Sequence, residues 1–105
     1  MKSINDINEF YELTDQPKPI LLDFYADWCG PCQTLMPTVE KISHKFQDNI
    51  EVRKVNVDQN RELTAKFDVR SIPTLFFLKG DKILDRTVGL VTTNPLIEKV
   101  NNMIS

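Results

Sequence analysis

The 105-residue chain contains few of the residues that mark specialised architectures: three glycines, two cysteines, one tryptophan and one histidine. So few cysteines exclude a disulfide-framework miniprotein, and so few glycines exclude a collagen-like repeat. No apolar run approaches the roughly 20 residues that a membrane helix needs, and the first residues lack the apolar stretch of a signal peptide. The sequence therefore predicts a cytoplasmic protein without a membrane segment.

Charge of neither sign dominates. Thirteen basic and fifteen acidic residues give a net charge of −2, and the two signs are interspersed along the chain. Without a basic stripe, nucleic acid is not an expected partner. Apolar residues make up 41% of the chain, and a chain of this length buries roughly 65% of its unfolded surface. We therefore expect one domain over residues 1–105, acting as a monomer.

Hydrophobic periodicity predicts the order of the secondary-structure elements. Apolar residues three or four positions apart predict helices, and continuous apolar runs predict buried strands. The expected helices cover residues 5–14, 31–46, 60–67 and the segment after Asn94, and the expected strands cover residues 20–26, 51–57, 74–78 and 83–88. Two strands joined by a helix and followed by a hairpin predict a mixed sheet covered by helices.

Capping residues refine the ends of these helices. Asn5 or Asp6 is expected to cap the first helix, and Asp58 or Asn60 the third. In the last helix Asn94 is expected at the cap and Pro95 at the first helical position. Its inward residues are expected to be Leu96, Ile97, Val100 and Ile104.

The two cysteines, Cys29 and Cys32, are separated by two residues. A disulfide between them closes a very short loop, so it adds little stability. Such a pair is more typical of a redox-active or metal-binding site. Metal is the weaker alternative, because a zinc site needs four ligands and only His44 offers a comparable further ligand, unless two chains share a four-cysteine site.

The cysteine pair falls where a strand is predicted to meet a long helix. Unsatisfied N–H groups and the dipole at a helix N-terminus favour an anion, so they stabilise a thiolate at Cys29. Cys32 lies one turn further on and is expected to be less exposed. Pro31 is tolerated in a first helical turn, and Gly30 permits the close approach of another chain. This pattern predicts a reversible dithiol, with an inert buried pair or a structural bridge as the alternative.

The pentapeptide Trp28–Cys32 resembles the active-site motif of the thioredoxin family. The resemblance extends over essentially the whole chain. Further similar segments are Asp23–Ala26, Pro37, Lys54–Asp58, Ser71–Thr74 and Val88–Gly89. The resemblance implies an α/β thioredoxin fold, which is a single domain with a five-stranded mixed sheet and helices on both faces. The first strand is expected to be short and to lie around Lys2–Ile4.

The resemblance also implies roles for individual residues. Cys29 is similar to the attacking cysteine and Cys32 to the resolving cysteine. Pro73 is similar to a cis-proline, although the general frequency of X–Pro bonds favours trans. A cis bond would turn the backbone of Ile72 towards an extended substrate segment. The residues expected to contact substrate are Trp28, Gly30, Pro31, Ile72, Pro73 and Gly89.

Asp23 interrupts an otherwise apolar strand, where burial should raise its pKa. The resemblance implies that this carboxylate lies beneath Cys32 and assists its deprotonation. Lys54, on the neighbouring strand, is implied to lower the cost of ionising Asp23. The alternatives are an Asp23 satisfied by backbone donors or placed at a strand end, and a solvated strand lysine at Lys54.

The resulting hypothesis is a protein-disulfide reductase that holds no cofactor and no metal. Its partners would be disulfide-containing substrate proteins and, by resemblance, a flavin-containing, NADPH-dependent thioredoxin reductase. One alternative is a thiol oxidase or isomerase, which the Gly30–Pro31 pair disfavours because such enzymes more often carry a histidine there. The other alternative is a partner-binding module whose affinity for its partner depends on the redox state of the cysteine pair.

Overall fold

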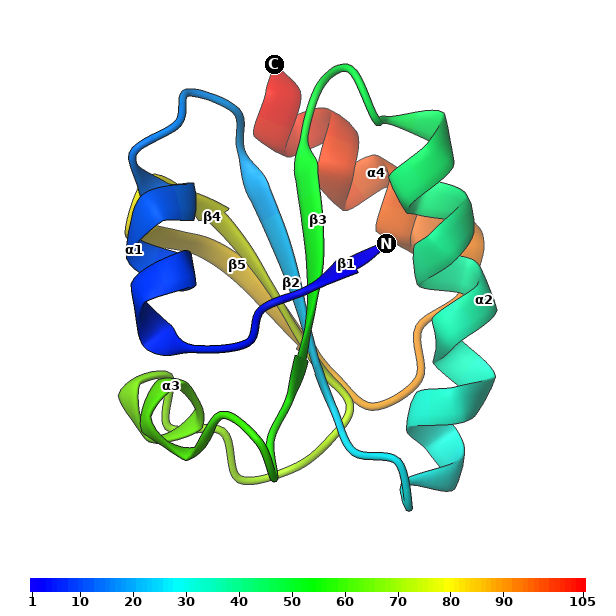
Figure 1. Ribbon diagram of the computed structural model, residues 1–105. Coiled ribbons are helices and arrows are strands. Elements are labelled where there is room, and N and C mark those ends of the chain that lie inside the picture. The colour runs from blue at the N-terminus through cyan, green and yellow to red at the C-terminus, as the bar shows by residue number, and fades with distance from the viewer.

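A computed structural model describes all residues from Met1 to Ser105 and shows one five-stranded sheet with the strand order β1-β3-β2-β4-β5 (Figure 1). Strands β1, β3 and β2 run parallel, β4 is antiparallel to β2, and β5 is antiparallel to β4. The strands are β1 (Lys2–Ser3), β2 (Ile20–Tyr25), β3 (Glu51–Asn56), β4 (Thr74–Lys79) and β5 (Lys82–Val88). The expected mixed sheet is therefore confirmed.

Four helices cover the sheet, two on each face. They are α1 (Ile7–Thr14), α2 (Gly30–Lys45), α3 (Arg61–Lys66) and α4 (Thr93–Ile104). Figure 1 shows α1 and α3 on one face and α2 and α4 on the other. Asp6 caps α1, because its carboxylate accepts the N–H of Glu9 at 2.9 Å.

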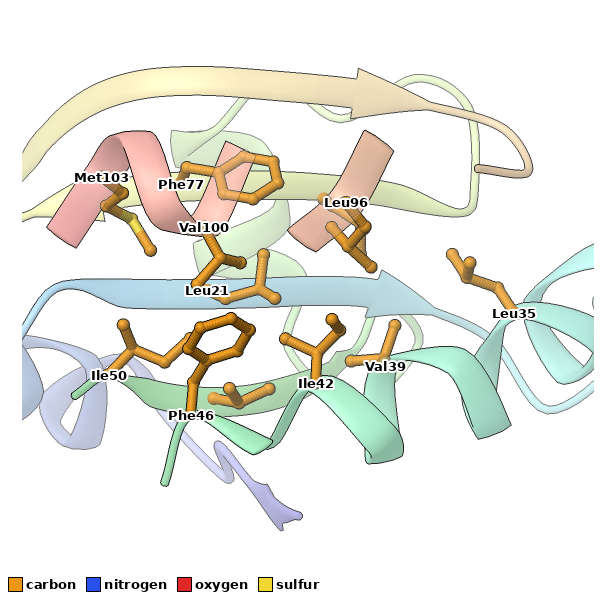
Figure 2. Close-up of a cluster of buried hydrophobic side chains, with 12 residues drawn as sticks. Leu21, Leu35, Val39, Ile42, Phe46, Ile50, Phe77, Leu96, Val100 and Met103 are labelled. Atoms are coloured by element: carbon orange, nitrogen blue, oxygen red, sulfur yellow. The ribbon is translucent and has the colours of Figure 1, made fainter. Parts of the chain in front are cut away.

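The central strand β2 is buried over its whole length, as its apolar run predicts. Successive side chains of a strand point to opposite faces, so β2 contributes to two separate cores. Leu22 packs in the core beneath α1 and α3. Leu21 packs in the core beneath α2 and α4, where Figure 2 shows side chains of both helices directed at the sheet. Asp23 shares the face of Leu21, so its carboxylate lies on the side of the sheet that α2 covers.

The start of the last helix differs from the prediction. The cap position is Thr92, not Asn94, and Pro95 is the third helical residue, not the first. No N–H in the first turn has an intrahelical partner, so proline fits at several positions there and does not fix the first residue. The inward residue near the C-terminus is Met103, at 6% exposure, and not Ile104, at 38%.

Candidate active site

The two cysteines lie at the edge of the sheet where β2 ends and α2 begins. Cys29 is the N-cap of α2, with an extended backbone (φ −89°, ψ 109°), and its Sγ accepts the N–H of Cys32 at 3.2 Å. Cys29 and Cys32 form a disulfide with their Cα atoms 5.3 Å apart. The predicted position at a helix N-terminus is thus confirmed. The same N–H would face a thiolate on Cys29 after reduction.

Both cysteines are largely buried in this oxidised form. Cys29 is 5% exposed and Cys32 is 1% exposed. The expected order of accessibility holds, but Cys29 is more covered than the sequence indicates. Tyr25 and Ala26 pack with the disulfide, and Ile72 lies against this small cluster. The outer sulfur, that of Cys29, therefore lies beside Ile72 in a largely covered cluster.

A loop far away in the sequence completes this surface. The Ile72–Pro73 peptide bond is cis, as the resemblance implies. The carbonyl oxygen of Ile72 lies 3.8 Å from the Sγ of Cys29, and the N–H of Gly89 donates to the carbonyl of Pro73 at 2.8 Å. The loop before β4 therefore lies directly against the outer sulfur, and a hydrogen bond joins that loop to the end of β5.

The backbone conformation of the site requires a glycine at position 89 but not at position 30. Gly89 has φ +85°, a left-handed conformation in which any side chain would be strained. Gly30 needs no positive φ, and a Cβ placed on it would meet nothing within 4 Å. Its missing side chain therefore leaves open space on the outside of the molecule, beside the exposed Pro31.

Trp28 is held at the rim of the site by Asp58, for which the sequence predicts no role beyond a possible helix cap and a place in the family-like segment Lys54–Asp58. Its side chain is 72% exposed, and its Nε1–H donates to the Oδ2 of Asp58 at 2.8 Å. Asp58 follows β3, which runs parallel to β2. Parallel neighbours end at the same edge of a sheet, and that rule is the signal that could have placed Asp58 beside Trp28.

Asp23 is buried without a hydrogen-bond partner. It is 1% exposed, and no donor reaches either of its carboxylate oxygens. It is therefore not the backbone-satisfied residue that one alternative describes, nor is it at a strand end, because β2 continues to Tyr25. Asp23 pairs in register with Lys54 on β3 and Leu75 on β4.

The surroundings of Asp23 shift its protonation equilibrium. Burial raises the pKa of Asp23 from 3.8 to about 7, and the positive charge of Lys54 opposes this rise. Lys54 is only half-buried and forms no ion pair; its Nζ lies 5.8 Å from the centroid of the Tyr25 ring. A group that titrates near neutral pH is suited to accept and return protons there.

Metal binding finds no support in the arrangement of ligands. No three side chains among His, Cys, Asp and Glu come together as a metal site would need. His44 is exposed near the C-terminal end of α2, three turns from the cysteines. As to membranes, none of the four helices is both long enough and apolar enough to span one.

A disulfide at a helix N-terminus, next to a cis-proline loop at the edge of a mixed sheet, defines a thiol–disulfide oxidoreductase. The family model "Thioredoxin" matches residues 2–102. The chain is 42% identical to a thioredoxin of Rickettsia bellii over 93 residues, 89% of each chain. It is 35% identical to a thioredoxin of Rickettsia typhi over 104 residues, 99% of each.

Solved structures agree with these sequence matches. The thioredoxin of Fasciola hepatica superimposes with a TM-score of 0.89 at 33% identity, over 98% of this chain and 99% of the other. This protein belongs to the thioredoxin family and is a thiol–disulfide oxidoreductase.

Proposed function

We propose that the protein is a cytoplasmic protein-disulfide reductase. The observation that carries this proposal is the Cys29–Cys32 disulfide at the N-terminus of α2, with its outer sulfur beside the carbonyl of Ile72. Such an arrangement presents a reversible dithiol to an extended partner segment. The residues between the cysteines, Gly30 and Pro31, add no charge or acid–base group, which favours a reductase over an oxidase or isomerase.

The reaction begins with the reduced protein. The thiolate of Cys29 attacks one sulfur of a substrate disulfide, forms a mixed disulfide and releases the other substrate sulfur as a thiolate. Cys32 then loses its proton and attacks the Sγ of Cys29, which releases the second substrate thiolate. Two electrons pass from the dithiol to the substrate, and the Cys29–Cys32 disulfide remains.

In the second step Asp23 would take the proton of Cys32. Its carboxylate is on the face of the sheet that α2 covers, and a base with a pKa of about 7 is partly ionised at neutral pH. Lys54 would keep a fraction of Asp23 ionised by opposing the effect of burial. Proton transfer through an intervening water is compatible with two carboxylate oxygens that lack protein donors.

The substrate would lie along the loop that carries Ile72 and Pro73. An extended segment can pair with the backbone of Ile72 as a strand does. Gly89 would leave room beside that segment, Gly30 and Pro31 would permit its approach from the other side, and Trp28 would shield the reacting sulfurs.

A coupled assay tests the proposal. NADPH, a thioredoxin reductase and a disulfide-bonded protein substrate are mixed with the protein, and NADPH consumption is followed. We expect turnover that depends on the protein and that Cys29→Ser abolishes. Partner binding without any turnover would indicate the binding module. Net formation of disulfides in a reduced, unfolded substrate by the oxidised protein, without reduction in the coupled assay, would indicate the oxidase.

A further inference from the structure

A second concave surface lies next to the active site, on the face of the sheet that α1 and α3 cover. It is an open cleft of about 430 Å³ between the loop after α3 and the ends of β4 and β5. Residues that line it include Arg70 and Ser71 from the loop, Thr74 from β4, and Arg86 and Val88 from β5. We refer to it as the arginine cleft.

The arginine cleft carries more positive than negative charge. Of its lining residues, Arg70 and Arg86 are cationic and Asp68 is the one anion. Asp68 contacts Arg70 only at Nε, at 3.2 Å, and both side chains are largely exposed, so the pair is weak and leaves the terminal nitrogens of Arg70 free.

Arg86 has no partner at all for its guanidinium. The guanidinium takes part in no ion pair and no hydrogen bond, and only the backbone N–H of Arg86 donates to a side chain, the Oδ1 of Asp85 at 2.8 Å. The neighbouring Asp85 does not neutralise it, because Asp85 is on the opposite side of the strand and pairs there with Lys99 of α4. An unpaired guanidinium presents a planar set of donors suited to a carboxylate.

The arginine cleft is continuous with the surface that meets the substrate. Ser71 precedes Ile72, whose carbonyl lies beside the Sγ of Cys29. Val88, 60% exposed, precedes Gly89, whose N–H is bonded to Pro73. An extended chain advances roughly 3.3 Å per residue and repeats its facing side chain after two residues. A segment that pairs at Ile72 and runs on past Ser71 would bring a side chain near its cysteine to the arginine cleft.

We propose that the arginine cleft selects substrate proteins that carry an Asp or Glu side chain within a few residues of the disulfide cysteine. The carboxylate would accept hydrogen bonds from Arg86 and Arg70, while the backbone of the same segment pairs at Ile72. This inference rests on the proposed reductase function and adds a preference for one class of substrate sequence.

Peptide disulfides test this preference without any reductase. Each probe is a symmetric disulfide of a short peptide with one cysteine, and the probes differ only in Glu, Gln or Lys two positions to each side of it. The reduced protein is mixed with each probe, and oxidation is followed by the fluorescence of Trp28, the only tryptophan. The product is the Cys29–Cys32 disulfide plus two peptide thiols.

We expect the Glu probe to react about two- to fivefold faster than the Gln probe at low ionic strength, as for exposed charge pairs. High salt should bring this ratio towards one, and so should the double variant Arg70→Gln/Arg86→Gln. Arg86→Glu should shift the preference towards the Lys probe. Lys41→Glu, the same change of net charge by two at an exposed position of α2, should keep the wild-type preference for the Glu probe.

The outcomes separate this inference from the function on which it rests. If no probe oxidises the reduced protein, the proposed reductase function is wrong. If Glu and Gln probes react at the same rate, or if the double variant keeps the wild-type ratio, the arginine cleft does not select acidic substrates, although the reductase function stands.

Discussion

Replacing Asp23 by alanine removes a buried carboxylate that opposes folding when it is ionised. Its pKa rises from 3.8 to about 7 on burial, which corresponds to about 4 kcal/mol of lost stability once both the folded and unfolded forms are ionised. Alanine leaves a small cavity that costs about 1 kcal/mol. We therefore expect Asp23→Ala to be about 3 kcal/mol more stable than the wild type above pH 7.

The sign of the stability difference between Asp23→Ala and the wild type changes with pH. A carboxylate with a raised folded pKa binds more protons in the folded state than in the unfolded state, so wild-type stability falls as pH rises from about 4 to about 7. Asp23→Ala lacks this decline. Well below pH 4 both the folded and the unfolded forms of Asp23 are protonated, and only the cavity left by the variant affects its stability. The two stability curves should therefore cross at about pH 4.5.

Denaturant melts between pH 4 and pH 8 measure these curves. Asp48→Ala is the control, because Asp48 is exposed and in no ion pair, and its curve should run parallel to that of the wild type. Asp23→Asn, which keeps the volume but cannot ionise, should also lack the decline. An Asp23→Ala variant that is less stable at every pH would show Asp23 to be a structural residue, and the proposed base role would be withdrawn.

Further predictions concern the proposed roles of the other site residues. Brief alkylation of the reduced protein should label Cys29 before Cys32, and equal labelling by mass spectrometry would contradict their assignment. Cys32→Ser should accumulate mixed disulfides with substrate on non-reducing gels, and Cys29→Ser should not. If the two variants trapped substrate equally well, the attacking and resolving roles assigned to the cysteines would be wrong. Lys54→Met removes the charge that lowers the pKa of Asp23, so the stability decline should extend to higher pH in denaturant melts, and an unchanged profile would exclude the coupling. Asp58→Ala should free Trp28 and lower its fluorescence anisotropy, whereas unchanged anisotropy would mean that packing alone holds the ring.

Much of the fold follows from local patterns. The apolar run from Ile20 identifies β2 because a strand buried on both faces needs apolar side chains in succession. The position of Cys29 at a helix start follows from the strand before it and from Pro31, which suits a first turn. These features depend on neighbours in the sequence, so the sequence alone is enough to predict them.

Other features depend on contacts that local patterns do not encode. The start of α4 at Thr93 is such a case, since Pro95 fits at several positions of a first turn. The hydrogen bond from Trp28 to Asp58 joins residues 30 positions apart and requires the parallel pairing of β2 with β3. The low exposure of Cys29 likewise comes from the distant loop at Ile72 that covers its sulfur.

The burial of Asp23 follows from the local apolar run, whereas its pKa also depends on Lys54 from another strand. This environment offers a reason why a charged residue occupies the strand position. An apolar residue at this position would make the fold more stable, because ionised Asp23 opposes folding and no donor bonds its carboxylate oxygens. A close ion pair with Lys54 would lower the pKa and leave a permanently ionised carboxylate, which is a weaker base. Burial without any positive charge nearby would keep Asp23 protonated at neutral pH. Lys54 is near enough to oppose the effect of burial but forms no ion pair, so the pKa remains at about 7. In the proposed resolving step, a carboxylate that is about half ionised at neutral pH would accept a proton when Cys32 attacks and return it afterwards, and the instability at Asp23 would be the cost of that role.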